Sequence, residues 1–261
     1  MAAVGGLRAL RFITAHGFDA LSAEQDMGVG VQVDLLGGPS LQASARAADI
    51  FVAGDFYAGY GDTASFFVVR ALAEARRDRM TQRWDGVVAS GRLAWYGKPS
   101  SERTHKVNIE LSQVRQLVFP MQLTFRDPDG GLPGFGNSPS AGGQRLIAHV
   151  EERRLLGTFG TRADMAVGLF ATAGKLWAGD VPYGRTTPVR ASAGITLLGA
   201  YPAGGKRTYR VDLAVPINPE RGGARVELRF GSADRTRLLW LEPNDVARAR
   251  TGAVPVSLLK W

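Results

Sequence analysis

The chain has 261 residues, and 45% of them are hydrophobic, which excludes a largely disordered protein. Its formal charge is +8, but the basic residues are scattered singly along the chain, so we expect no nucleic-acid partner. The absence of cysteine excludes disulfides and thiolate metal sites. No apolar run approaches the ~18 residues of a transmembrane helix, and residues 1–8 lack the features of a signal peptide.

Alternation of apolar and polar residues is the dominant pattern, and it predicts twelve strands separated by turn-like segments. The predicted strands are 7–14, 28–36, 46–58, 65–76, 84–96, 103–112, 117–126, 144–155, 162–177, 189–197, 209–215 and 224–230. In the tail, residues 235–241 are compatible with an extension of the last strand, residues 244–250 have the pattern of a short capped helix, and residues 254–261 are apolar. We therefore expect an all-β barrel over residues 1–231 and a separate tail over residues 232–261.

A glycine-rich segment, residues 127–143, separates seven predicted strands from five. Its part from Gly130 to Gly143 holds six glycines and two prolines, which excludes regular helix or strand interior. Loops longer than about a dozen residues are uncommon unless they are functional. The sequence therefore predicts a long functional loop here.

The polar face of the predicted strands carries charges of both signs, whereas the opposite face is built from Val, Leu, Ile, Ala and Phe. The charged residues that we expect to form a ladder inside the barrel are Arg145, Glu151, Arg153, Arg190, Arg210, Asp212, Arg225, Glu227 and Arg229. An apolar outside with a polar inside, repeated about ten times, is typical of a transmembrane β-barrel. Aromatic residues near predicted strand ends fit the girdles of such barrels: Trp84, Trp95, Tyr96, Trp177, Tyr183, Tyr201 and Tyr209. The alternative is a soluble sandwich or barrel with a solvated face.

Several segments resemble the bacterial surface antigen family, outer-membrane β-barrels related to the barrel-assembly factor and to two-partner secretion transporters. Residues 131–135, 142–145 and 151–153 resemble the family's sixth extracellular loop and the strand after it. Residues 170–177 resemble its Phe-x-Asp-x-Gly-x-x-Trp strand, and residues 189–194 and 209–216 resemble its last strands. The resemblance covers about residues 127 to 231. It implies an antiparallel transmembrane β-barrel in the bacterial outer membrane, in contact with lipid and acting in assembly, translocation or anchoring, with an unfolded or secreted polypeptide as a possible partner.

The resemblance places the functional loop motif at Leu132, Pro133, Gly134 and Phe135, opposite a strand position at Thr172 and Gly174. The family has an Arg at the position of Pro133 and an Asp at the position of Thr172. Joint loss of both charges is more tolerable than loss of one, because a single buried charge would remain unpaired. If the loop enters the barrel, its glycine backbone, Phe135 and other hydrogen bonds must hold it.

Family barrels have about sixteen strands and N-terminal periplasmic domains. With about twelve predicted strands, we expect either a sixteen-stranded barrel truncated at its start or a reduced twelve-stranded barrel.

No motif predicts an enzyme, a cofactor or a metal site. His16, His105 and His149 lack the spacing of metal ligands. Residues 136–140 fail the Gly-x-Ser-x-Gly pattern at its last position, and residues 134–136 lack the third glycine of a dinucleotide loop. Two alternatives stay open: a soluble β protein that binds a small ligand, and the barrel module of an envelope enzyme whose catalytic domain lies upstream.

Overall fold

The computed structural model describes residues 3–39, 49–78, 82–117, 121–160, 162–219, 226–234 and 244–251. The structure is 68% strand and 3% helix, so the fold is all-β, as predicted. One antiparallel sheet contains, in order, β1 (Ala3–His16), β2 (Glu24–Pro39), β3 (Asp49–Gly61), β4 (Ser65–Asp78), β5 (Trp84–Gly97), β6 (Arg103–Arg115), β9 (Gln144–Phe159), β10 (Ala163–Trp177), β11 (Arg190–Ala200), β12 (Arg207–Pro216) and β13 (Glu227–Asp234).

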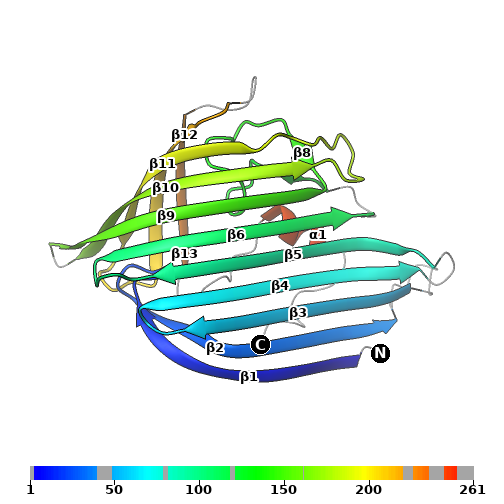
Figure 1. Cartoon of the computed structure of the whole chain (residues 1–261), viewed down its shortest axis with the longest axis horizontal. Helices are drawn as coiled ribbons and strands as arrows, with labels where there is room; N and C mark the ends of the chain where they lie inside the picture. Colours follow the sequence, from blue (N-terminus) through cyan, green and yellow to red (C-terminus); the bar gives the residue numbers. More distant parts are fainter. Residues whose placement is uncertain are drawn as a thin grey trace.

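The sheet is strongly curved, so one of its faces is concave and partly enclosed (Figure 1). Strands that are neighbours in sequence are neighbours in the sheet, except that β6 pairs with β9. The strands between them, β7 (Leu123–Thr124) and β8 (Ala141–Gly142), form a small pair of their own. In the part of the chain that the structure describes, β1 and β13 are edges and do not pair with each other, so the sheet is not closed into the predicted barrel.

The connections between strands differ at the two ends of the sheet. One end, the long-loop end, carries the connections at 116–143 and 178–189. The other, the short-turn end, carries the turns at 62–64, 98–102 and 160–162. Because antiparallel strands alternate in direction, every second connection lies at the same end.

Eleven of the twelve predicted strands are present as wall strands of the sheet, although residues 46–48 and 224–225 of two of them lie outside the described residues. The prediction of a strand over residues 117–126 was wrong. Of the residues that the structure describes in this range, 117 and 121–126, only Leu123 and Thr124 form strand pairs, with Gly142 and Ala141. Leu123 and Phe125 are fully buried beneath the loop, so the alternation in this segment reflects packing inside the sheet rather than a place in its wall.

In the tail, the predicted helix is confirmed as α1 (Asn244–Thr251). Residues 235–241 and 254–261, for which an extension and an apolar segment were predicted, lie outside the described residues. No described helix is long and apolar enough to span a membrane.

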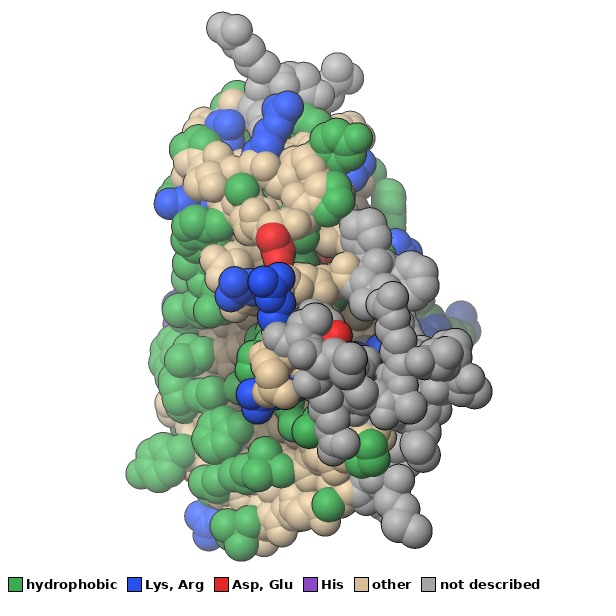
Figure 2. Space-filling view, turned by 90° about the vertical axis from the view of Figure 1, so that its right-hand side faces the viewer, with side chains coloured by type: hydrophobic (Ala, Val, Ile, Leu, Met, Phe, Trp, Pro, Cys, Tyr) green, Lys and Arg blue, Asp and Glu red, His purple; other side chains and the backbone are tan. Residues whose placement is uncertain are grey.

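Charged side chains lie on the concave face of the sheet, whereas the convex face exposes aliphatic ones. On β9, Arg145, Glu151 and Arg153 point to the concave face and are buried, whereas Val150 points outward and is 47% exposed. Figure 2 looks onto the long-loop end, and hydrophobic side chains gather along its left flank, which is the outer face of the wall strands. Charged residues are thus buried on the concave face of β9, where apolar clusters are buried as well, and aliphatic residues are exposed on the convex face.

Candidate functional site

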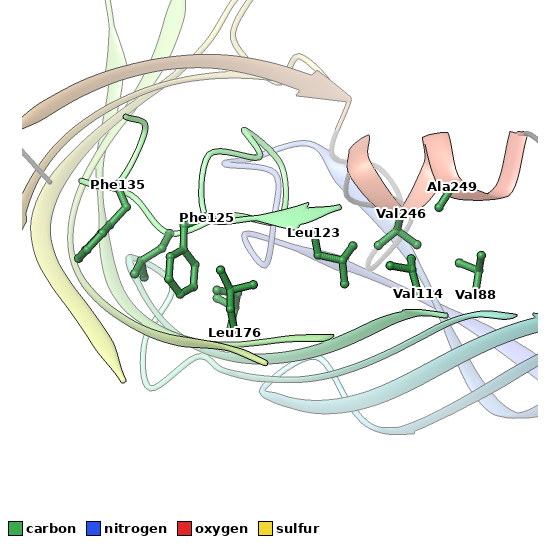
Figure 3. Packing of buried hydrophobic residues seen from close by; sticks show 10 residues of the cluster. Val88, Val114, Leu123, Phe125, Phe135, Leu176, Val246 and Ala249 are labelled. Atoms are coloured by element: carbon green, nitrogen blue, oxygen red, sulfur yellow. The ribbon is translucent and has the colours of Figure 1, made fainter. Parts of the chain in front are cut away.

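The connection between β6 and β9 folds onto the concave face and fills it at the long-loop end. Four of its large apolar side chains, Leu123, Phe125, Leu132 and Phe135, are fully buried. They form one cluster with wall residues and with α1 (Figure 3). The loop motif predicted at residues 132–135 therefore lies inside the curved sheet.

Gly174 makes room for this loop, which agrees with the prediction that it is a loop-facing position. A Cβ atom on Gly174 would lie 2.6 Å from Cδ1 of Ile147 and 3.0 Å from Cε1 of Phe125. The rings of Phe125 and Phe135 are in turn 5.9 Å apart. A larger residue at position 174 would push Phe125 away from the wall.

A carboxylate on the edge strand β13 holds the glycine backbone of the loop. Glu227 Oε2 accepts hydrogen bonds from the N–H groups of Gly134 (2.7 Å) and Gly136 (3.1 Å). Arg229 pairs with Glu227 at 2.8 Å and donates to the Leu132 carbonyl at 3.2 Å. Gly134 has a φ of +85°, a conformation that favours glycine. These bonds link the loop to the wall of the sheet.

Thr172 does not take part in this link. Its hydroxyl lies 2.8 Å from Nδ1 of His149, and both side chains, like Pro133, line the cavity described below. The sequence did not predict that Glu227 binds the loop. Its hydrogen bonds with Gly134 and Gly136 depend on where β13 lies in the folded protein. The sequence indicated only that Glu227 is an inward-facing acid and that the glycine-rich loop offers many backbone N–H donors.

Replacing Glu227 by glutamine should loosen the loop by about 1–2 kcal/mol, because two charge-assisted hydrogen bonds become neutral ones. The measurement is amide hydrogen exchange at Gly134 and Gly136, which should become roughly tenfold faster. Glu152→Gln on the exposed face of β9 is the matched control and should leave both amides protected. Unchanged exchange in Glu227→Gln would contradict the anchoring role.

Arg145 joins the wall, the loop and the tail helix. Its side chain is 0% exposed. It donates to Asp245 of α1 (2.5 Å), to Glu110 of β6 (3.2 Å) and to the Thr124 carbonyl of the loop (2.7 Å). Glu110 also pairs with Arg92 at 2.9 Å. A second buried pair, Arg250 with Glu74 at 2.5 Å, attaches the other end of α1 to β4.

Two carboxyl groups meet where α1 docks. Burial raises the pKa of Asp245 to about 7, Arg145 opposes that rise, and Asp127 adds to it. Burial would also raise the pKa of Asp127. Hydrogen bonds outweigh this effect and lower it, chiefly the bond that Asp127 accepts from the backbone N–H of Asp245 at 2.7 Å. The pKa values of the two groups are therefore shifted in opposite directions.

A second group of charges lies deeper on the concave face. Arg210 pairs with Glu151 at 2.6 Å and with Asp212 at 2.7 Å, and His149 Nε2 lies 3.3 Å from Glu151. A cavity of about 400 Å³ adjoins this group, and its lining also includes Arg92, Lys106, Asn108 and Glu110. In this group Glu151 and Asp212 both pair with Arg210, and all three were predicted as residues of the inward-facing charge ladder.

Two of the predicted ladder residues bind backbone carbonyls, and a third lies outside the described residues. Arg153 binds backbone carbonyls instead of an acid, donating to Gly17 (2.9 Å), Asp19 (3.3 Å) and Phe18. Arg190 donates to the carbonyl of Asn218 at 3.1 Å. Arg225 lies outside the described residues.

The carbonyls that Arg153 binds belong to residues 17–23, which turn inward at the short-turn end. Gln25 Oε1 accepts hydrogen bonds from three consecutive N–H groups, of residues 18–20. Phe18 packs on Tyr96, with ring centroids 5.2 Å apart. Tyr96 is therefore fully buried on the concave face, and its predicted place in an outer aromatic girdle was wrong.

No group of three or more potential metal ligands occurs among the described residues. Comparison of the chain with protein-family models, with curated proteins and with solved structures found no match.

Proposed function

We propose that this protein is a non-enzymatic outer-membrane β-barrel protein of the surface antigen type. The β6–β9 loop and α1 fill its interior, and it acts in the assembly, translocation or anchoring of polypeptides. The observation that carries this proposal is the exposed convex face of aliphatic side chains, together with paired charges buried on the concave face.

Two rows of cross-strand neighbours make the convex face apolar. One row runs through Val69, Leu93, Ile109 and Ala148, and the other through Leu169, Ile195, Leu213 and Leu228. Leu169, Ile195 and Leu213 are 63%, 51% and 45% exposed. An apolar surface that extends across so many strands marks contact with lipid or with a partner, because soluble monomers rarely expose one.

The spacing of exposed aromatic residues matches a bilayer. Trp84 and Trp95 lie at opposite ends of β5, both on the convex face and both partly exposed. Their eleven-residue separation spans about 36 Å of strand, or about 28 Å when the strand tilts by roughly 40°. The apolar band of outer-membrane barrels is about 25 Å tall. Trp177 lies at the same end as Trp84.

In a membrane the two edge strands of the sheet would need hydrogen-bond partners. Backbone groups cannot be left unpaired in lipid, so β1 and β13 must both be paired when the protein is in the membrane. The packing of the β6–β9 loop and α1 on the concave face favours anchoring or gated passage over an open pore.

The direct test is fractionation of expressing cells, followed by electrophoresis of the outer-membrane fraction with and without heating. We expect recovery with the outer membrane and faster migration without heating. Recovery in the soluble fraction without detergent would overturn the proposal and favour the soluble ligand-binding alternative.

The substitution Ile195→Arg distinguishes a convex face that meets water from one that meets lipid. Ile195 is exposed in the structure, so Ile195→Arg should change stability by less than about 0.5 kcal/mol if this face meets water. It should cost about 2–4 kcal/mol near the middle of a bilayer. The measurement is the free energy of unfolding in phosphatidylcholine vesicles. Leu156→Arg, which is near the short-turn end and also exposed, is the matched control, with an expected cost below about 1 kcal/mol.

A further inference from the structure

Basic and aromatic side chains gather on the convex face at the long-loop end of β4, β5, β6 and β10. This basic rim consists of Arg77, Trp84, Arg115, Lys175 and Trp177. Arg77 and Trp84 are cross-strand neighbours, and the guanidinium lies 5.8 Å from the indole centroid. Lys175 Nζ lies 5.1 Å from the ring of Trp177. Arg115 is exposed on β6, between these two pairs.

The charges of the rim have one sign. Among the described residues, Arg77, Arg115 and Lys175 form no ion pair with an acid, although Arg77 donates to Gln82 in the adjoining turn at 2.7 Å. At the short-turn end the convex face is mixed, with Glu152 beside Arg103 and Arg154, and Arg154 lies 3.8 Å from Glu102. Asp180, in the connection after β10, accepts a hydrogen bond from the backbone N–H of Gln116 at 2.9 Å. The wall strands themselves are therefore basic on their convex face at the long-loop end and mixed at the short-turn end, which distinguishes the two interfaces of the proposed membrane span.

We propose that the basic rim binds the phosphomonoester groups of a glycolipid in the membrane leaflet that faces the long loops. This inference rests on the proposed function, because it requires that the convex face lies in a bilayer. In outer-membrane barrels the longer connections are extracellular, which places the rim at the outer leaflet.

The chemistry of the rim fits phosphomonoesters better than singly charged headgroups. A phosphomonoester carries a charge of about −1.5 to −2 and three strong acceptor oxygens. Arginine presents a fork of N–H donors that matches such oxygens bidentately, and lysine adds a point charge. From β4 to β10 the rim crosses four strand spacings, or roughly 19 Å, which is wide enough for more than one phosphate.

The tryptophans position these cations. An indole ring at the interface of a membrane stays at headgroup depth. A cation stacked on its face is held at the same depth and gains from the ring quadrupole. The Arg77–Trp84 and Lys175–Trp177 pairs therefore orient two of the three charges before lipid binds.

The test compares wild type with a rim variant, Arg77→Gln/Arg115→Gln/Lys175→Gln, and with a control variant, Arg103→Gln/Arg154→Gln/Arg207→Gln. Both variants lose three positive charges, but the control residues lie toward the short-turn end. Each purified full-length protein is titrated with diphosphorylated lipid A in neutral detergent, and bound lipid is measured by native mass spectrometry. The second probe is the same lipid without its phosphates.

We expect the rim variant to bind diphosphorylated lipid A at least roughly tenfold more weakly than wild type at low salt, and the control variant to stay within about twofold. The dephosphorylated lipid should bind all three proteins equally. Equal weakening in both variants, or equal binding of both lipids by wild type, would overturn the inference.

Measuring insertion of the three proteins into neutral phosphatidylcholine vesicles tests the proposed function independently of phosphate binding by the basic rim. All three proteins should insert and show heat-modifiable migration, which also verifies that the variants fold. Insertion without a preference for phosphate would overturn the basic rim alone, whereas failure of wild type to insert would overturn the proposed function.

Discussion

Replacing Arg145 by methionine should destabilise the protein by about 3–5 kcal/mol, the largest effect that we expect from any single substitution in the interior. Arg145 is fully buried and contacts two acids, Glu110 and Asp245. Methionine has a similar volume and fills the space. It leaves the carboxyl group of Asp245 and the Thr124 carbonyl without their buried donor, and removal of one partner from a buried ion pair carries a cost of this size.

The free energy of unfolding by urea, measured in detergent or in vesicles, tests this expectation. Arg154→Met is the matched control, because Arg154 lies on the same strand with its side chain 60% exposed, and it should cost less than about 1 kcal/mol. The double variant Arg145→Met/Asp245→Asn removes both charges and should recover part of the loss. A cost below 1 kcal/mol for Arg145→Met would show that the network does not hold the interior together.

Docking of α1 should be tighter at pH 5 than at pH 8. The pKa of Asp245 rises from an ordinary 3.8 to about 7 when the helix is docked, so between these values the docked state binds a proton that the undocked state lacks. Docking is then favoured as the pH falls through 7, by up to about 4 kcal/mol for a shift of this size. The lowered pKa of Asp127 acts in the opposite direction. Its contribution is lost only as the pH falls below about 4, so docking should be strongest between about pH 4 and 6.

The chain has no cysteine, so a single introduced thiol can report on the helix. Ala249 is 6% exposed in the interior cluster, and Ala249→Cys should react with a maleimide only when α1 is undocked. Arg248→Cys, on the exposed side of the same helix, corrects for the effect of pH on thiol reactivity. The corrected rate at position 249 should rise several-fold from pH 5 to pH 8.

Two further variants separate Asp245 from the rest of the helix contacts. Asp245→Asn resembles the protonated acid and should abolish the pH dependence. Glu74→Gln weakens the Arg250 attachment of α1 and should raise labelling at every pH without changing the profile. A pH profile that Asp245→Asn leaves unchanged would contradict the assignment.

The sequence by itself determined the strands and their two faces. In β9 to β12, the alternation at Arg145, Glu151, Arg210 and Asp212 correctly predicted which side chains point inward, because side chains of a strand alternate between faces. The short helix at 244–250 was predictable for the same local reason, since helix capping depends on neighbouring residues.

The contacts within the interior could be identified only in the tertiary structure. Residues 117–126 alternate as a wall strand would, but the burial of Leu123 and Phe125 under the loop depends on Val246 and Ala249, more than a hundred residues away. Likewise, nothing near Glu227 in the sequence indicates that it accepts hydrogen bonds from Gly134 and Gly136.

Local pattern therefore decides the face on which a residue of this chain lies, because side-chain direction follows from the backbone of its own strand. Partners such as Glu227 for the glycine loop, or Asp245 for Arg145, are decided by the curvature of the sheet and by the return of distant segments onto its concave face. Curvature and return depend on packing summed over the whole fold, so only the tertiary structure shows which donor meets which acceptor.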